Sequence, residues 1–257
     1  MSLLVSGGLF VLGAIIASFV GVLVGRLNTG QGFLTGRSHC DACNATLTPL
    51  ALVPILSYFF LRGRALCCGA RLSPWSPVAE ALLGVLFAGA YLNLGFVPAL
   101  PFFLFSLSAL LALVLYDLGH QIIPSPFLAA FVVASAITGF FLAPVLPAFL
   151  SSLTNAFLIG ASLALIHFLS RGRAMGLADA PLAFGLALLT GPSAFSGFVF
   201  SFWIGALVGI VLLLGRPAGS RMGVEVPFAP FLAAGFLLAY FTQWNPFAFI
   251  AALAVFQ

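Results

Sequence analysis

Two aspartates lie beside long apolar stretches and are the first candidates for chemistry. Asp117 ends one such stretch and Asp179 begins another. An ionisable group within a membrane span costs roughly 2.5–3.5 kcal/mol at the helix centre, so its presence needs a reason. Two carboxylates that meet across a helix bundle can share a proton, so that one acts as an acid while the other activates water. The pair predicts hydrolysis of a peptide bond without a metal or a nucleophilic side chain.

A structural role for each aspartate is the alternative. Either carboxylate can cap a helix or pair with a nearby arginine, and Asp179 follows a glycine-containing turn, where an acid at a helix N-terminus is ordinary. The chain offers few residues for other kinds of catalysis, because it has no lysine and its histidines (His39, His120 and His167) are scattered. His167 falls within an apolar stretch, where we expect a packed neutral histidine. The chain has no Gly-x-Ser-x-Gly or His-Glu-x-x-His motif.

Four cysteines form the second group of candidates. Cys40 and Cys43 have the spacing of a metal knuckle, and Cys67 and Cys68 are adjacent. In a reducing compartment a Cys-x-x-Cys is more often a metal or redox site than a structural disulfide. The adjacency makes it difficult for both later sulfurs to bind one tetrahedral zinc. We expect either a zinc site in the segment 26–76 or a zinc ribbon whose second knuckle has decayed and is held by packing alone.

The composition places these residues in a membrane protein. Of the 257 residues, 63% are hydrophobic and 5% are charged, whereas an average soluble domain carries roughly 25% charged residues. The first apolar stretch, Leu3 to Gly25, lacks a preceding basic region and a clear cleavage site, which predicts a retained helix. We predict an all-α polytopic membrane protein with about eight transmembrane helices and a small cytoplasmic cysteine-containing segment between the first two. The predicted spans are 3–25, 77–95, 99–116, 124–143, 150–170, 180–191, 194–215 and 227–254.

The arginines orient these spans. With eight crossings, all nine arginines fall on one face, and the loops near 96–98, 144–149 and 192–193 carry none. The positive-inside bias makes that face cytoplasmic and puts both termini outside. No dense basic run is present that would bind nucleic acid. The predicted parts are an anchoring helix (1–25), the cytoplasmic segment (26–76) and a seven-helix domain (77–257). The arginines are Arg26, Arg37, Arg62, Arg64, Arg71, Arg171, Arg173, Arg216 and Arg221.

Several motifs, in order along nearly the whole chain, resemble those of the prepilin peptidases, which are aspartic proteases of the bacterial inner membrane. Tyr116-Asp117, followed by Ile123-Pro124, resembles the first aspartate motif of that family, and Met175-Gly-Leu-Ala-Asp179 resembles the second. The remaining similar motifs are Gly13–Phe19, Gly25–Leu27, Arg37–Cys43, Val53–Tyr58, Leu61–Arg64, Cys68-Gly69, Ser76–Glu80 with Leu83-Gly84, and Val226–Pro230.

The resemblance implies that Asp117 and Asp179 are the catalytic pair, with Glu80, Met175 and Gly176 binding substrate or supporting the site. The implied reaction removes the basic leader of prepilins or pseudopilins at the cytoplasmic face, as needed for type IV pili or type II secretion. Proteolysis of this kind needs no cofactor. Many members also methylate the new N-terminus with S-adenosylmethionine, an activity associated with the cytoplasmic segment.

The chain also departs from the family pattern. Two alanines replace glycines in the second aspartate motif, and an alanine replaces the expected cysteine in the second knuckle. These changes leave open a catalytically silent homologue that serves as a scaffold in pilus or secretion assembly. A small ion-coupled transporter is a further alternative, although such sites usually lie near the midplane. The departing residues are Gly21, Ala65, Ser125, Ala174, Ala178 and Pro181.

Overall fold

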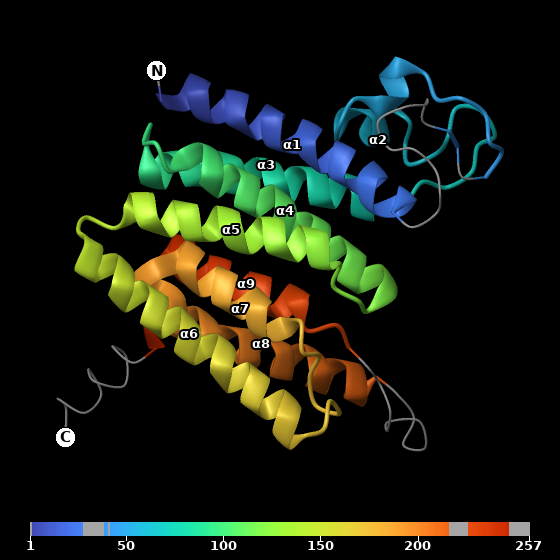
Figure 1. Cartoon of the computed structure of the whole chain (residues 1–257). Coiled ribbons are helices and arrows are strands. Elements are labelled where there is room, and N and C mark those ends of the chain that lie inside the picture. Colours follow the sequence, from blue (N-terminus) through green and yellow to red (C-terminus); the bar gives the residue numbers. More distant parts are fainter. Residues whose placement is uncertain (1, 28–38, 41, 216–225, 247–257) are drawn as a thin grey trace, which may run out of the picture. The chain divides into compact units, whose positions relative to one another are not determined.

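The computed structural model describes residues 2–27, 39–40, 42–215 and 226–246, and this part of the chain is helical without any strand (Figure 1). The all-α polytopic fold is therefore confirmed. Arg37, Asp41, Arg216, Arg221, Glu225 and the end of the last predicted span lie outside the described residues. The helices are α1 (Ser2–Arg26), η1 (Pro49–Leu52), α2 (Leu56–Phe60), α3 (Trp75–Leu94), α4 (Leu100–His120), α5 (Ser125–Leu142), α6 (Leu146–Leu169), α7 (Asp179–Thr190), η2 (Gly191–Ser193), α8 (Ala194–Leu214) and α9 (Ala229–Thr242).

The predicted spans coincide with helices that are suited to a bilayer. In the described chain, six helical stretches are long and apolar enough to cross a membrane. The last of them, Asp179–Leu214, consists of α7 and α8 joined by the short turn η2, and α7 has only 12 residues. The 14 residues of α9 form a further, shorter apolar helix. A multi-pass membrane protein is thus confirmed, whereas the count of eight crossings stays a prediction.

The chain divides into two compact units, Met1–Phe96 and Val97–Gln257. In the first unit α1 and α3 lie side by side (Figure 1). Glycines allow this close approach, since a Cβ atom added at Gly13 would lie 2.8 Å from the Leu83 carbonyl oxygen. One added at Gly84 would lie 2.8 Å from the Phe10 carbonyl oxygen. Small residues at such a crossing let two apolar helices gain van der Waals contact where lipid offers no hydrophobic driving force.

In the second unit α9 packs against α4, α7 and α8. Gly197 of α8 and Gly235 of α9 lie at a close crossing, because a Cβ atom added at Gly197 would be 2.7 Å from the Phe236 Cα atom. A Cβ atom added at Gly235 would collide with Ser201. The middle of α9 therefore packs closely against α8, and α9 also packs against α4 and α7, the helices that carry the two aspartates.

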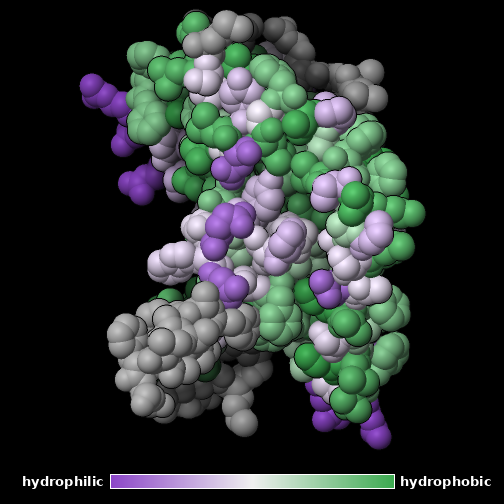
Figure 2. Space-filling view, turned by 90° about the vertical axis from the view of Figure 1, so that its left-hand side faces the viewer, coloured by the Kyte–Doolittle hydropathy of each residue, from purple (hydrophilic) through white to green (hydrophobic). Residues whose placement is uncertain are grey.

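The outer faces of the helices are hydrophobic. The face drawn in Figure 2 is mixed, with hydrophobic side chains over much of its right-hand side and hydrophilic ones across its middle. Large apolar side chains that are more than half exposed occur along the spans, such as Leu92, Phe105, Val133, Phe157 and Leu207. Surfaces of this kind suit contact with lipid and would be poorly wetted by water.

Candidate functional site

The two aspartates lie in the same unit and are both buried. Asp117 lies in the last turn of α4 and is 5% exposed, and Asp179 is the first residue of α7 and is 6% exposed. Their carboxylates are close enough to interact electrostatically. The structure therefore brings together the two acids that the sequence singled out, through the packing of α4 and α7 against α9.

Asp117 is held by the beginning of α9. The backbone N–H of Ala229, the first residue of α9, donates a hydrogen bond to Asp117 Oδ2 over 3.3 Å. This donor belongs to the first helical turn, whose N–H groups have no partner within the helix. The N-terminal end of a helix also carries a partial positive charge that favours a nearby carboxylate. The Val226–Pro230 motif, which contains Ala229, thus supplies a hydrogen-bond donor to the first aspartate.

Asp179 is held by the loop that precedes its own helix. The N–H of Gly176 donates to Asp179 Oδ2 over 3.1 Å. The carbonyl oxygen of the neighbouring Met175 lies 2.9 Å from Nδ1 of His167 in α6. A carbonyl can only accept, so Nδ1 carries the proton in this contact. Met175 and Gly176, which the family resemblance marked as supporting residues, are therefore in contact with the aspartate or with the helix behind it.

The Oδ1 atom of each aspartate remains available for a catalytic contact. Both backbone amides bind an Oδ2 atom, and neither Oδ1 has a hydrogen-bond partner within the described ranges. Neither aspartate pairs with an arginine among those residues, which removes one part of the structural alternative. A structural role in the loop ahead of α7 accounts for the Oδ2 contact of Asp179 but leaves its Oδ1 unexplained. Two fixed carboxylates with one open oxygen each can hold a water molecule and a shared proton.

The departures in the second aspartate motif fit the local backbone. Ala178 has φ −69° and ψ −18°, which alanine adopts as easily as glycine does. Ala174 is likewise not among the residues with positive φ. Pro181 lies in the first turn of α7, where a missing N–H leaves no intrahelical bond unmade. None of the three changes therefore prevents the loop from presenting Asp179.

The first unit contains two short hairpins with the same hydrogen-bond pattern. In the first, Cys40 N–H donates to the Ala45 carbonyl and Asn44 N–H donates to the Cys40 carbonyl, over 2.9 and 2.8 Å. In the second, Ala65 N–H donates to the Ala70 carbonyl and Gly69 N–H donates to the Ala65 carbonyl, both over 2.8 Å. Ala65 thus occupies the position that Cys40 occupies in the first hairpin, and the second hairpin lacks a sulfur there.

Cys67 supplies the fourth sulfur from a different position. The Sγ atoms of Cys40, Cys43, Cys67 and Cys68, which we call the cysteine cluster, all lie within 4.8 Å of one another. The pairs 43–67, 40–68 and 67–68 are separated by 3.2, 3.7 and 3.9 Å. Zinc–sulfur bonds of about 2.3 Å in a tetrahedron separate the sulfurs by roughly 3.8 Å. The adjacency of the last two cysteines, expected to be an obstacle, does not prevent both sulfurs from facing one metal ion, and the cluster could hold one.

The electrostatics of the cluster favour a cation. A hydrogen bond from the Ala42 backbone lowers the pKa of Cys40 to about 7. The hydrogen bond shared with the Cys43 sulfur raises the pKa of Cys67 to about 12. Crowded thiols share their protons in this way because neighbouring thiolates repel one another. A divalent ion would remove that repulsion and stabilise the fully deprotonated set.

Glu80 also lies in the first unit, where it secures the backbone ahead of α2. Its side chain is 5% exposed, and its Oε2 accepts a hydrogen bond of 2.7 Å from the N–H of Ile55. Its Oε1 lies 3.4 Å from the Ser76 hydroxyl. Ile55 has φ 61° and ψ −55°, a conformation that costs a branched residue about 1–3 kcal/mol. The carboxylate thus supports a strained turn of the first unit, and its predicted role toward substrate or the aspartates stays a prediction.

Comparison with known proteins gives two kinds of match. The family model of the bacterial peptidase A24 N-terminal domain matches residues 11–94, which include the cysteine cluster and Glu80 but neither aspartate. A prepilin leader peptidase/N-methyltransferase of Bacillus subtilis is 33% identical over 90% of this chain and 92% of its own length. Proteins of the same name from Myxococcus xanthus and Dichelobacter nodosus are 32% and 31% identical, over 83% and 79% of this chain and 65% and 71% of their own lengths. No solved structure matches.

Proposed function

The chain belongs to the prepilin leader peptidase/N-methyltransferase family, and from this premise we propose that it is an aspartic endopeptidase that removes the basic leader of prepilins or pseudopilins. The observation that supports this most strongly is the pair of buried aspartates, each held at Oδ2 by a backbone amide and open at Oδ1. The proposed setting is the bacterial inner membrane, with the cysteine-bearing segment in the cytoplasm and both termini outside.

In the proposed reaction the two Oδ1 atoms work on one water molecule. The ionised aspartate removes a proton from the water as its oxygen attacks the scissile carbonyl carbon, and the protonated aspartate first stabilises the developing oxyanion. When the C–N bond breaks, a proton passes from the dyad to the leaving amine, which restores one shared proton. The scissile segment must be extended, because the carbonyls of a helical peptide are already engaged in hydrogen bonds within the helix.

Asparagine substitutions test the dyad. Asp117→Asn and Asp179→Asn keep the shape of each side chain and remove the ability to exchange a proton. Because general acid–base catalysis contributes at least about 100-fold, each variant should lose that much or more of its leader cleavage in proteoliposomes. The matched control is Asp41→Asn, which changes the only other aspartate of the chain. Cleavage by either dyad variant at the wild-type rate would show that the assignment is wrong, and an inactive wild type would favour the scaffold alternative.

We also propose that the cysteine cluster binds zinc. Cys40, Cys43, Cys67 and Cys68 would hold the ion, whose role would be to join the two hairpins, since a closed four-thiolate site leaves no position for a substrate. Elemental analysis of the purified chain should find about one zinc per chain, and less than about a tenth would dismiss the site. Cys67→Ser should lose zinc, whereas the double variant Ala65→Cys with Cys67→Ala should keep it, because it moves the sulfur to the matching hairpin position.

N-methylation of the new N-terminus with S-adenosylmethionine is the second proposed activity. It is supported by the name that the relatives share, prepilin leader peptidase/N-methyltransferase. Transfer of a labelled methyl group to a pilin peptide that lacks its leader tests it independently of cleavage. The Asp117→Asn variant should still methylate this peptide, and the absence of transfer by the wild-type chain would limit the function to proteolysis.

A further inference from the structure

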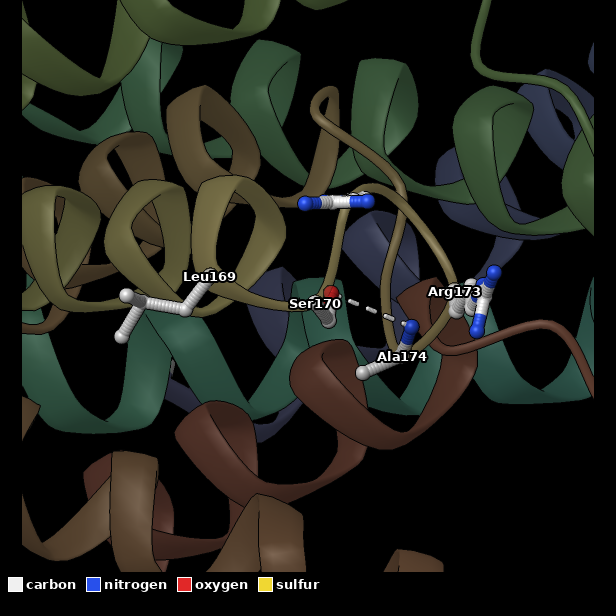
Figure 3. A pocket seen from close by; sticks show the side chains of 5 residues that line it. Leu169, Ser170, Arg173 and Ala174 are labelled. Carbon is white, nitrogen blue, oxygen red and sulfur yellow. Dashed lines mark hydrogen bonds between the residues drawn. The ribbon is translucent and has the colours of Figure 1, made fainter.

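A pocket at the end of α6 takes no part in the proposed cleavage. It has a volume of about 510 Å³ and is lined by five consecutive or nearly consecutive residues of the second unit (Figure 3). In Figure 3 the Ser170 side chain points toward the backbone nitrogen of Ala174. The Arg173 side chain lies on the opposite side of the loop from Leu169. The lining residues are Leu169, Ser170, Arg171, Arg173 and Ala174.

The two guanidinium groups of this pocket are not needed to complete the helix end. The Gly172 N–H donates to the His167 carbonyl over 2.9 Å, and the Arg171 N–H donates to the Phe168 carbonyl over 3.2 Å. These backbone bonds satisfy the last carbonyls of α6 in the manner of a Schellman motif, with Arg171 in the left-handed conformation at φ 54°. The arginine side chains therefore extend from a helix end that is already closed.

The pocket also contains no negative charge. None of its lining residues is acidic, and among the described residues neither Arg171 nor Arg173 forms an ion pair. The Ser170 hydroxyl is occupied within the loop, since it donates to the His167 carbonyl over 3.1 Å and accepts from the Ala174 N–H over 3.3 Å. Two full positive charges outweigh the partial negative charge of about one half at a helix C-terminus. The pocket is therefore a net attractor for an anion.

The surface next to the pocket suits hydrocarbon. Leu165, Phe168 and Leu169, on the last two turns of α6, are 58%, 67% and 76% exposed. The helix is one of the stretches able to cross a membrane, so its end lies where hydrocarbon gives way to water. A ligand that matches both features carries a phosphate beside two apolar chains.

We propose that this pocket binds an anionic phospholipid, with its phosphate between the guanidinium groups of Arg171 and Arg173 and its acyl chains along Leu165, Phe168 and Leu169. Arginine suits this ligand because its planar fork donates two parallel hydrogen bonds to phosphate oxygens. Free phosphate carries the same charged group as the lipid but has no acyl chains, so it would contact the arginines and not the apolar side chains of α6. This binding is separate from the proposed cleavage and holds whether or not the dyad is catalytic.

Native mass spectrometry of the full chain tests the proposal by counting retained phosphatidylglycerol. The double variant Arg171→Gln with Arg173→Gln should bind this lipid roughly 30-fold more weakly, since each basic group near an anionic headgroup contributes about fivefold. The control is Arg62→Gln with Arg64→Gln, which removes the same charge from two exposed side chains of the first unit and should leave retention unchanged. The wild type should retain phosphatidylcholine far less than phosphatidylglycerol.

Three results would overturn the proposal. The first is equal retention of phosphatidylglycerol by the wild type and the Arg171/Arg173 double variant. The second is an equal loss in both double variants, which would mean that net charge alone attracts the lipid. The third is displacement of the lipid by millimolar inorganic phosphate, which would assign the pocket to a free anion. Should the double glutamine variant fail to fold, the single variants Arg171→Gln and Arg173→Gln should each weaken retention about fivefold, and unchanged retention in both would count against the proposal.

Discussion

The amide of Ala229 can be removed without removing any side chain of the dyad. Ala229→Pro deletes the N–H that donates to Asp117 Oδ2. Proline is favoured in the first turn of a helix, and α9 already has one at the next position, Pro230. The substitution therefore tests whether the start of α9 holds Asp117 in its reacting position.

The expected loss follows from the geometry of that bond. A hydrogen bond to a charged group contributes about 1.5–3 kcal/mol, which corresponds to roughly 10- to 150-fold in rate. The N···O distance of 3.3 Å lies at the long end of the range, so we expect the lower value, a fall of about 10-fold. The measurement is single-turnover cleavage of a prepilin in proteoliposomes, which reports the chemical step separately from product release.

Two controls separate the lost donor from altered packing. Ala229→Gly keeps the N–H and removes one buried methyl group, which costs about 0.8 kcal/mol of stability and should leave the cleavage rate nearly unchanged. Phe228 has φ −93° and ψ −25°, a conformation disfavoured before proline, so the thermal unfolding temperature of each variant must be compared. A proline variant that cleaves at the wild-type rate, or a glycine variant that loses as much, would refute the reasoning.

Three further predictions concern packing, the strained turn and the metal. Gly235→Ala should destabilise the protein by about 1–3 kcal/mol in thermal unfolding, because the added methyl group collides with Ser201; Gly209→Ala, with no atom within 4 Å, should be neutral, and equal effects would contradict the close crossing. Glu80→Ala should cost about 1–3 kcal/mol by leaving the Ile55 N–H unpaired, and Glu80→Gln, which keeps an acceptor, should cost less. Zinc affinity of the cysteine cluster should fall with decreasing pH by roughly tenfold per unit for each thiol that must lose a proton, so an affinity flat between pH 8 and 6, measured by competition with a chelator, would argue against thiolate ligands.

Much of the membrane architecture could be predicted from the sequence because it depends on local properties. A span needs about 20 apolar residues in a row, and such runs are visible without knowledge of their neighbours. Within the described residues, the predicted spans accordingly coincide with α1 and with α3 to α9. The aspartates stood out for the same reason, since an acid beside an apolar run is rare. The turn between α7 and α8 was also marked by its Gly191-Pro192 pair.

The contacts around the site were decided by tertiary structure. Ala229 reaches Asp117 from a distant helix, and His167 binds the Met175 carbonyl, whereas the sequence suggested only a packed histidine. The cysteine pairing is a similar case, because Cys67 compensates in space for the sulfur that Ala65 lacks in sequence. Apolar periodicity sets the length of each helix but not which helix it packs against. That choice depends on shape at crossings such as Gly197 with Phe236, where a single added carbon would force the helices apart.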